Sequence, residues 1–471
     1  MRRHKTEAYR WAEEEFGGAR LGDRRRRDRL VLMAAAANEH PDGRVCEVFS
    51  DAGEMHGAYD FLESRHATCA ELTAAMGRAT AKRCVGLPFV YVAIDGSSLT
   101  LTDTDCEKGF GSIGARTFGA RGLKVISALA VDAEGTTMGL LSQVWWSRPK
   151  KKRKSVEQRR RLRTEDKETQ RWIDTIEQAT ATCEEQQVKP WFVLDREADG
   201  RAILLALYTS GHAFTVRSSW DRVVESTGRD GQHLRAILAA QKPWGSYALE
   251  VTAADNRTAR TAQMMIRVTQ VTVSLKDTRT KKVDWVPLTA VWVSEEGTTP
   301  AGERAIDWML YTNQPVHDIA GVRNIVNGYA KRWRIEEFHK TWKSGACNAE
   351  RTQLRSVEAV KKWATILAAV ATRIERLKLL SRNQPDTPAT AELSTDEIRV
   401  LVALARNITK RAERPPTSSL NIAEATSWIA RLGGYTGKSS GGPPGSITLR
   451  RGLEHLRFAL AGVRAVADLE N

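Results

Sequence analysis

Residues 329–343, YAKRWRIEEFHKTWK, combine the side-chain types that could bind and cleave a phosphodiester: aromatic rings, cations, a histidine and the adjacent carboxylates Glu336 and Glu337. In one continuous helix, successive residues are about 100° apart. Four side chains then fall within about 60° of one another, namely Tyr329, Arg332, Glu336 and Lys343. Glu337 lies outside that arc, so the spacing favours Glu336 as the chemical residue. The alternative is a solvent-exposed helix with incidental pairs such as Arg332 with Glu336.

Two aspartates end apolar runs that read as buried strands. Asp95 follows VYVAI and Asp195 follows WFVL. One such aspartate is more often a turn or a helix cap. Two on sibling strands, with Glu336 as a third carboxylate, would make a divalent-metal site, because hard cations prefer oxygen ligands. Two ions held in this way can activate water and stabilise the leaving oxygen of a phosphodiester.

Changes in hydrophobic period divide the chain. Residues up to about 80 read as helices, with Asp23 as a plausible N-cap before the four arginines 24–27. Residues 88–219 predict the order β-β-β-α-β-α-β. Residues 220 to about 305 alternate at period two, which predicts an antiparallel insertion. DWMLYTN returns to the core, and a polar, Pro-containing linker precedes further helices from 394 onward.

The composition indicates a globular protein with a polyanionic partner. The chain has 471 residues and a formal net charge of +15, and phosphate neutralisation favours such a surface. Residues 148–163 are especially basic; they contact DNA or form a solvated loop. No apolar run approaches the ~20 residues of a membrane span. The six cysteines are scattered, which predicts reduced thiols in a cytoplasmic protein. A membrane surface and simple solubility are the alternative readings of the charge.

The pattern Y-x2-R-x3-E-x6-K resembles the YREK motif of bacterial DDE transposases of the IS-four family. The resemblance also covers IDGSSL around Asp95, LDREAD around Asp195, RWRIEEFHKTWKSGA and ARLGD. It extends in order over nearly the whole chain. It implies a ribonuclease-H-like mixed-sheet catalytic core with an antiparallel β insertion, flanked by N- and C-terminal helical domains. The implied domains are 1–80 for DNA-end binding, 81–381 for catalysis and 394–471 for dimerisation.

In this family, Asp95, Asp195 and Glu336 would hold two Mg²⁺ ions, which Mn²⁺ can replace. The implied activity is cut-and-paste transposition: hydrolytic nicking of a transposon end, excision through a DNA hairpin, and joining of 3′-OH ends to target DNA. The implied partners are the double-stranded transposon ends, target DNA and a second copy of the chain in a synaptic complex. No membrane and no small-molecule cofactor are expected, and the implied location is the bacterial cytoplasm, at the nucleoid.

The resemblance also assigns DNA contacts. Trp308 matches the position that stacks a flipped base, although the residues alone would make it a core aromatic. Ser219 replaces a basic residue of the family, so some end contacts must differ. The expected DNA-binding residues are Tyr329, Arg332, Lys343, Trp308, Trp333, Arg217, Arg121, Lys124, Arg24, Arg25, Arg26 and Arg27.

Three other functions stay open from sequence. A domesticated ribonuclease-H-like endonuclease would keep the fold and the carboxylates but not transpose. A metal-independent DNA-end-binding repressor would use the acids structurally. A glycosidase with two catalytic acids is the third, although nothing in that activity explains the basic segment 329–343.

Overall fold

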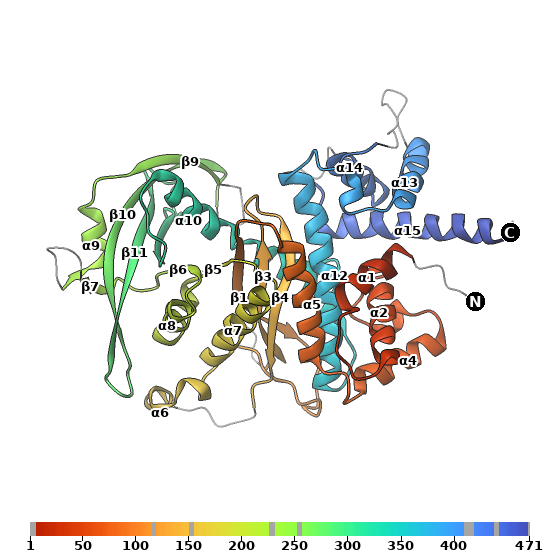
Figure 1. Ribbon diagram of the computed structural model, residues 1–471, viewed down its shortest axis with the longest axis horizontal. Coiled ribbons are helices and arrows are strands. Elements are labelled where there is room, and N and C mark those ends of the chain that lie inside the picture. Colours follow the sequence, from red (N-terminus) through yellow and green to blue (C-terminus); the bar gives the residue numbers. More distant parts are fainter. Residues whose placement is uncertain are drawn as a thin grey trace.

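The computed structural model describes residues 6–114, 119–149, 155–225, 231–251, 257–408, 419–437 and 442–469. A mixed β-sheet runs through the molecule (Figure 1). A long antiparallel hairpin extends it at one end, and two groups of helices, formed by the two ends of the chain, pack against the other end. The expected fold class, a mixed core with a β insertion and helical flanks, is confirmed.

The described N-terminal part of the chain forms five helices, and all but α3 begin with a side-chain cap. They are α1 (Glu7–Phe16), α2 (Arg24–Glu39), α3 (Val45–Val48), α4 (Ala52–Glu63) and α5 (Cys69–Cys84). The Asp23 carboxylate accepts a hydrogen bond of 2.8 Å from the Arg25 amide, so the predicted N-cap of α2 is confirmed. Leu30 and Met33 of α2 are buried, whereas Arg24 is exposed. The arginines therefore open the helix without entering the core.

The central sheet is built from the predicted strands. Its elements are β1 (Val90–Thr100), β2 (Gly111–Ser112), β3 (Arg121–Val131), β4 (Thr137–Trp146), β5 (Pro190–Leu194), β6 (Ala213–Arg217) and β12 (Asp307–Thr312). The strand order is β2-β3-β1-β5-β6-β12, and β4 pairs with β3. β1, β5 and β6 are parallel, whereas β3 and β12 run antiparallel to their neighbours. The connecting helices are α6 (Val156–Arg161), α7 (Thr169–Glu185) and α8 (Arg201–Thr209).

The predicted insertion is present and continues the same sheet through β12. It contains β7 (Val223–Glu225), β8 (Gln232–His233), α9 (Leu234–Ala239), β9 (Gly245–Val251), β10 (Arg260–Lys276) and β11 (Val283–Glu296). Burial alternates along β10, where Met264, Ile266 and Val268 face the core. This period-two pattern explains why the segment was recognisable in the sequence.

Helix α12 (Val357–Asn383) is a long central helix that packs against the sheet and against helices from both ends of the chain. It is buried on almost every side and contacts β4, α2, α4, α5, α11, α14 and α15 (Figure 1). Lys362 of this helix is buried, and its ammonium donates 2.7 Å hydrogen bonds to the carbonyls of Leu62 and Ser64. A charged group enclosed in this way needs such hydrogen bonds to offset its loss of hydration.

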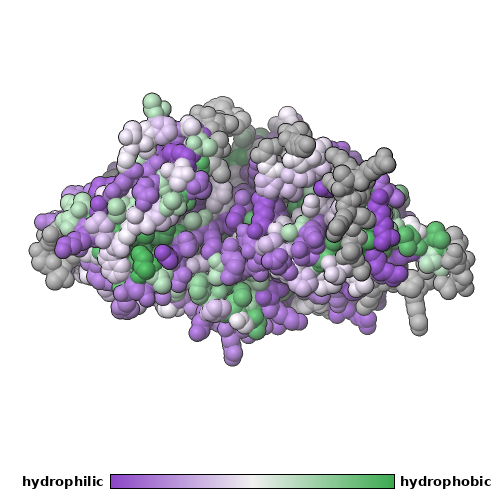
Figure 2. Space-filling view, turned by 90° about the horizontal axis from the view of Figure 1, so that it is seen from above, coloured by the Kyte–Doolittle hydropathy of each residue, from purple (hydrophilic) through white to green (hydrophobic). Residues whose placement is uncertain are grey.

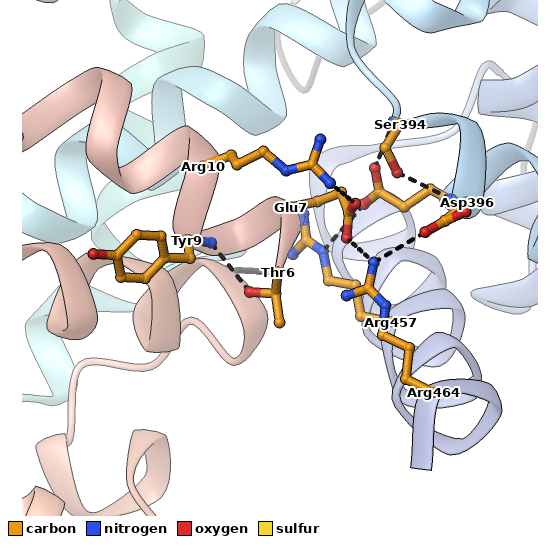
Figure 3. A network of polar contacts seen from close by, with 9 residues as sticks. Thr6, Glu7, Tyr9, Arg10, Ser394, Asp396, Arg457 and Arg464 are labelled. Atoms are coloured by element: carbon orange, nitrogen blue, oxygen red, sulfur yellow. Dashed lines mark hydrogen bonds and ion pairs between the residues drawn. The ribbon is translucent and has the colours of Figure 1, made fainter. Parts of the chain in front are cut away.

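The C-terminal helices are α13 (Thr395–Ile408), α14 (Ile422–Leu432) and α15 (Ser446–Leu469). Figure 3 shows how α15 is tied to the first helix of the chain. The Arg464 guanidinium pairs with the Glu7 carboxylate at 2.8 Å and with that of Asp396 at 3.3 Å. Glu7 also accepts a 2.7 Å hydrogen bond from Arg10. The two ends of the described chain therefore meet in one ion-pair network.

The outer part of α15 carries several exposed hydrophobic side chains. The side chains of Phe458, Val463 and Val466 are 80%, 57% and 55% exposed. Most of the face in Figure 2 is hydrophilic, with several separate hydrophobic patches, one of which lies at its right-hand end, where α15 projects. Among the helices that the structure describes, none has both the length and the apolar character that crossing a bilayer requires.

Candidate active site

Asp95 and Asp195 lie side by side on the neighbouring central strands β1 and β5. Asp195 directly follows β5 as expected, but Asp95 lies within β1, which stays paired with β3 as far as Thr100, so the expectation that Asp95 ends its strand is wrong. β1 and β5 are parallel and in register, with Ile94 opposite Leu194, so each aspartate follows a paired residue. Asp95 accepts a 2.7 Å hydrogen bond from the Gly96 amide, and Asp195 accepts one of 2.8 Å from the Glu197 amide. In open sheets the carboxyl ends of parallel strands are where ligands bind.

The segment that carries Glu336 is not one continuous helix, so that prediction is wrong. α10 (Ile319–Lys331) ends before Arg332, and α11 (Arg334–Lys343) begins after Trp333. The turn is tightened, because Ile335 and Glu336 donate their amides to the carbonyls three residues earlier. No glycine or proline marks this break in RWR. Tyr329 belongs to α10, whereas Glu336 and Lys343 belong to α11.

Arg332, in the turn between the two helices, connects the strands to α11. Its guanidinium lies 3.2 Å from the Asp95 carboxylate and 2.6 Å from the Glu336 carboxylate. The side chain is largely buried. Two of the three predicted carboxylates are therefore joined through a single cation, and the third, Asp195, flanks Asp95 on the neighbouring strand.

The electrostatics of Asp95 reflect a crowded acidic site. Burial raises the pKa of Asp95 to about 7, and the nearby Asp195 and Glu336 carboxylates act in the same direction. The Arg332 guanidinium and the Gly96 amide oppose this increase. A buried carboxyl group that titrates near neutrality among other acids is typical of a functional site.

The donor set fits a divalent cation in chemistry and in charge. The site has three carboxylates and too little positive charge to balance them, and a hard cation would stabilise such a group. Within the described residues, however, no group of three or more His, Cys, Asp or Glu side chains is already arranged to hold an ion. The Arg332 guanidinium lies between Asp95 and Glu336 instead. A cation bound here would compete with the guanidinium for the Asp95 and Glu336 oxygens.

Glu337 faces a different part of the protein from Glu336. Its carboxylate pairs with Arg334 at 2.9 Å and lies 3.9 Å from the Lys378 ammonium of α12. Lys378 in turn pairs with the fully buried Glu375. The two adjacent glutamates therefore make different contacts. Glu336 pairs with Arg332, which also binds Asp95, whereas Glu337 connects α11 to α12.

The aromatic candidates surround the turn at Arg332. Trp308 of β12 packs edge-to-face on Tyr329, with ring centroids 5.2 Å apart. Tyr329 is 5% exposed, whereas Trp333 is 57% exposed. Trp308 is half-buried. A ring supported from one side by tyrosine can offer its other face to a base.

The other predicted DNA contacts are distributed unevenly. Lys343 is on the same helix as Glu336, and its ammonium lies 3.7 Å from the Glu350 carboxylate. Arg217 donates to the Asp307 carbonyl beside Trp308 at 2.9 Å. Arg121, in contrast, donates to the Asp103 carboxylate and the Phe110 carbonyl, and so holds the 101–112 loop. Its contacts are those of a structural residue and do not bring it to the carboxylates.

The remaining basic residues make their contacts away from the carboxylates. Lys124 lies over the Trp146 ring and 3.5 Å from Glu168. Arg148 also binds Glu168, and these contacts, with a hydrogen bond from Trp146, lower the pKa of Glu168 to about 2 although burial alone would raise it. Residues 150–154 of the basic run lie outside the described residues. At the start of α2, Arg24 and Arg25 are exposed, and Arg26 and Arg27 are partly so.

Sequence reasoning missed two residues that shape the site. Asp199, in LDREADG, is 4% exposed and binds the loop after β6. His339 lies on α11 between Glu336 and Lys343, and burial together with the charges of Lys343 and Arg332 lowers its pKa to about 3. Only burial distinguishes Asp199 from an ordinary turn aspartate, and burial is not readable from a polar motif.

Family models match two parts of the chain. Residues 8–67 match the transposase DNA-binding model, which covers α1 to α4. Residues 147–373 match the transposase DDE domain model, which includes Asp195 and Glu336 but begins after Asp95. The chain therefore combines a transposase DNA-binding domain with a transposase DDE domain and is a DDE-type DNA transposase.

Proposed function

We propose that this transposase works by cut-and-paste, through a hairpin, and that Asp95, Asp195 and Glu336 are its catalytic carboxylates. Two observations support this most directly: Asp95 of β1 lies next to Asp195, which follows the paired strand β5, and Arg332 contacts both Asp95 and Glu336. In the proposed sequence, hydrolysis of one strand frees a 3′-OH at the transposon end. That hydroxyl then attacks the opposite strand, and the hairpin is opened before joining to target DNA.

The three carboxylates would hold divalent cations, with Mg²⁺ as the natural ion. Bound there, such ions would lower the pKa of water and stabilise the leaving oxygen. The protein's own side chains bind and orient DNA. Arg332 would exchange its carboxylate partners for phosphate oxygens, since a guanidinium binds both bidentately. Lys343 would add a point charge to a flanking phosphate.

The base-stacking role of Trp308 belongs to the same proposal. Its ring is supported by Tyr329, as stacking on an extruded base would require. Trp308→Ala should slow hairpin formation more than first-strand nicking, because only the hairpin needs a sharply bent strand. Equal slowing of both steps in a single-turnover assay would contradict this role.

Pairing of two copies through α15 is also proposed. The exposed Phe458, Val463 and Val466 on the projecting part of this helix support it, because exposed apolar groups that gather on one element mark association surfaces. A dimer would bring two DNA ends together for synapsis. The 1–80 and 394–471 domains would then serve end recognition and dimerisation respectively.

The decisive experiment incubates the full-length protein with a duplex that carries the element's terminal repeat, with Mg²⁺ or with EDTA. We expect nicks and hairpins only with Mg²⁺, and neither product with Asp195→Asn. Binding without metal-dependent cutting by the wild type would favour a repressor. Cutting without any strand joining would favour a domesticated endonuclease.

A further inference from the structure

Trp220 is a large aromatic residue exposed beside the candidate active site. It lies in the loop between β6 and β7, and its side chain is 65% exposed. Scattered exposed apolar residues are ordinary on protein surfaces. The position of Trp220, and not its exposure alone, is therefore what requires an explanation.

The loop that carries Trp220 is fixed on the turn that carries Asp195. The Ser219 hydroxyl donates a 2.5 Å hydrogen bond to the carbonyl of Arg196, the residue after Asp195. The Ser218 amide donates at 2.7 Å to the carbonyl of Met309, the residue after Trp308. Trp220 thus follows two residues that connect one catalytic turn with the strand that carries Trp308.

Buried Asp199 stabilises the loop that carries Trp220. Its carboxylate accepts hydrogen bonds from the Ser219 amide at 2.7 Å and from the Arg222 guanidinium at 2.7 Å. Arg222 also donates to the Asp199 carbonyl at 2.9 Å. A single buried charge, satisfied by residues on both sides of Trp220, therefore orders the loop while the indole stays outside. A loop ordered in this way loses little backbone freedom when a ligand binds to it.

We propose that Trp220 is a stacking platform for an unpaired nucleobase of the DNA strand that passes Asp195. This inference rests on the proposed function, because it needs DNA at the three carboxylates. Aromatic side chains stack on any base, since every base has a π-face, and they do so beside cations that follow the backbone. The exposed Arg196 supplies such a cation next to the loop. The Trp220 platform would be separate from Trp308, whose ring packs on Tyr329.

The test uses the full-length protein and two forms of the terminal-repeat duplex, one fully paired and one mismatched next to the cut, with 2-aminopurine as the mismatched base. Trp220→Ala should weaken binding of the mismatched duplex about tenfold and abolish the quenching of 2-aminopurine. Binding of the paired duplex should not change. Trp220→Phe should restore most of the lost affinity and quenching, because it keeps a ring.

Trp285→Ala is the matched control, because Trp285 is 52% exposed on β11 of the insertion. It should behave as the wild type on both duplexes. If Trp220→Ala equals this control in affinity and quenching, the stacking inference is wrong, and a change in self-association instead would assign Trp220 to a protein contact. Wild-type protein that neither cuts nor binds the terminal repeat would refute the proposed function itself. Thermal unfolding of each variant shows whether the loop still folds.

Discussion

The adjacent glutamates of α11 offer the sharpest test of the site, because the same substitution at neighbouring positions should have opposite consequences. Glu336 lies 2.6 Å from Arg332 and is a third exposed. Glu336→Gln keeps the shape of the side chain but removes a charge from the acidic site. Loss of a carboxylate that stabilises the transition state by about 4 kcal/mol would slow nicking about 1,000-fold. Folding stability should change by less than ~1 kcal/mol, because the pair is partly solvated.

Glu337→Gln should show the reverse pattern. Its carboxylate pairs with Arg334 and approaches Lys378, and both cations would lose a partner. We expect the midpoint of thermal unfolding to fall by roughly 1–3 °C, while the nicking rate changes by less than about tenfold. The nicking rate should change little because Glu337→Gln leaves Asp95, Asp195 and Glu336 in place.

Single-turnover nicking of a terminal-repeat duplex, with binding measured separately in EDTA, distinguishes the two outcomes. Glu336→Gln should bind DNA ends nearly as the wild type does. If both variants lose cutting equally, or if Glu337→Gln alone loses it, the assignment of Glu336 as the third carboxylate is wrong.

Three further predictions rest on charge and exposure. Burial raises the pKa of Asp95 from 3.8 to about 7, so between these pH values the folded state binds more protons than the unfolded state. The free energy of unfolding without metal should therefore fall as pH rises from about 4 to about 7. Asp95→Asn should flatten this pH dependence in denaturant titrations with EDTA. Phe458→Asp should prevent pairing of two DNA-bound copies in sedimentation experiments, without changing nicking by single copies. Arg464→Ala removes the contacts to Glu7 and Asp396 and should increase hydrogen exchange in α15 while leaving α7 unchanged.

The strands and the position of both aspartates were readable from sequence, because their signals are local. VYVAI and WFVL are apolar runs too short for helices, and each ends at an aspartate. The insertion was equally readable, since β10 alternates between buried and exposed positions. β4 runs parallel to β1, because both are antiparallel to β3, and α7 then connects β4 with β5. The resulting parallel pairing of β1 with β5 brings Asp95 next to Asp195.

The contacts of individual cations were not readable, because they depend on the burial of distant partners. The family resemblance assigned Arg121 to DNA binding, yet Asp103 and Phe110 accept its hydrogen bonds. Asp199 looks like one more turn residue, yet it is buried beneath the loop of Trp220. Neither residue differs in sequence pattern from a surface group.

The helical wheel placed Arg332 next to Glu336, and this contact is present even though the single helix that it assumed is interrupted. The turn at Arg332 and Trp333 keeps nearly helical dihedral angles, so Arg332 still reaches Glu336 although α10 has ended. From this turn the guanidinium also reaches across to Asp95. One side chain therefore pairs with two of the acids that would hold a metal and also carries the fork that suits a phosphate. If DNA and metal ions bind at these carboxylates as proposed, this guanidinium cannot serve both partners fully at once, so the two binding events should be coupled and each should favour the other.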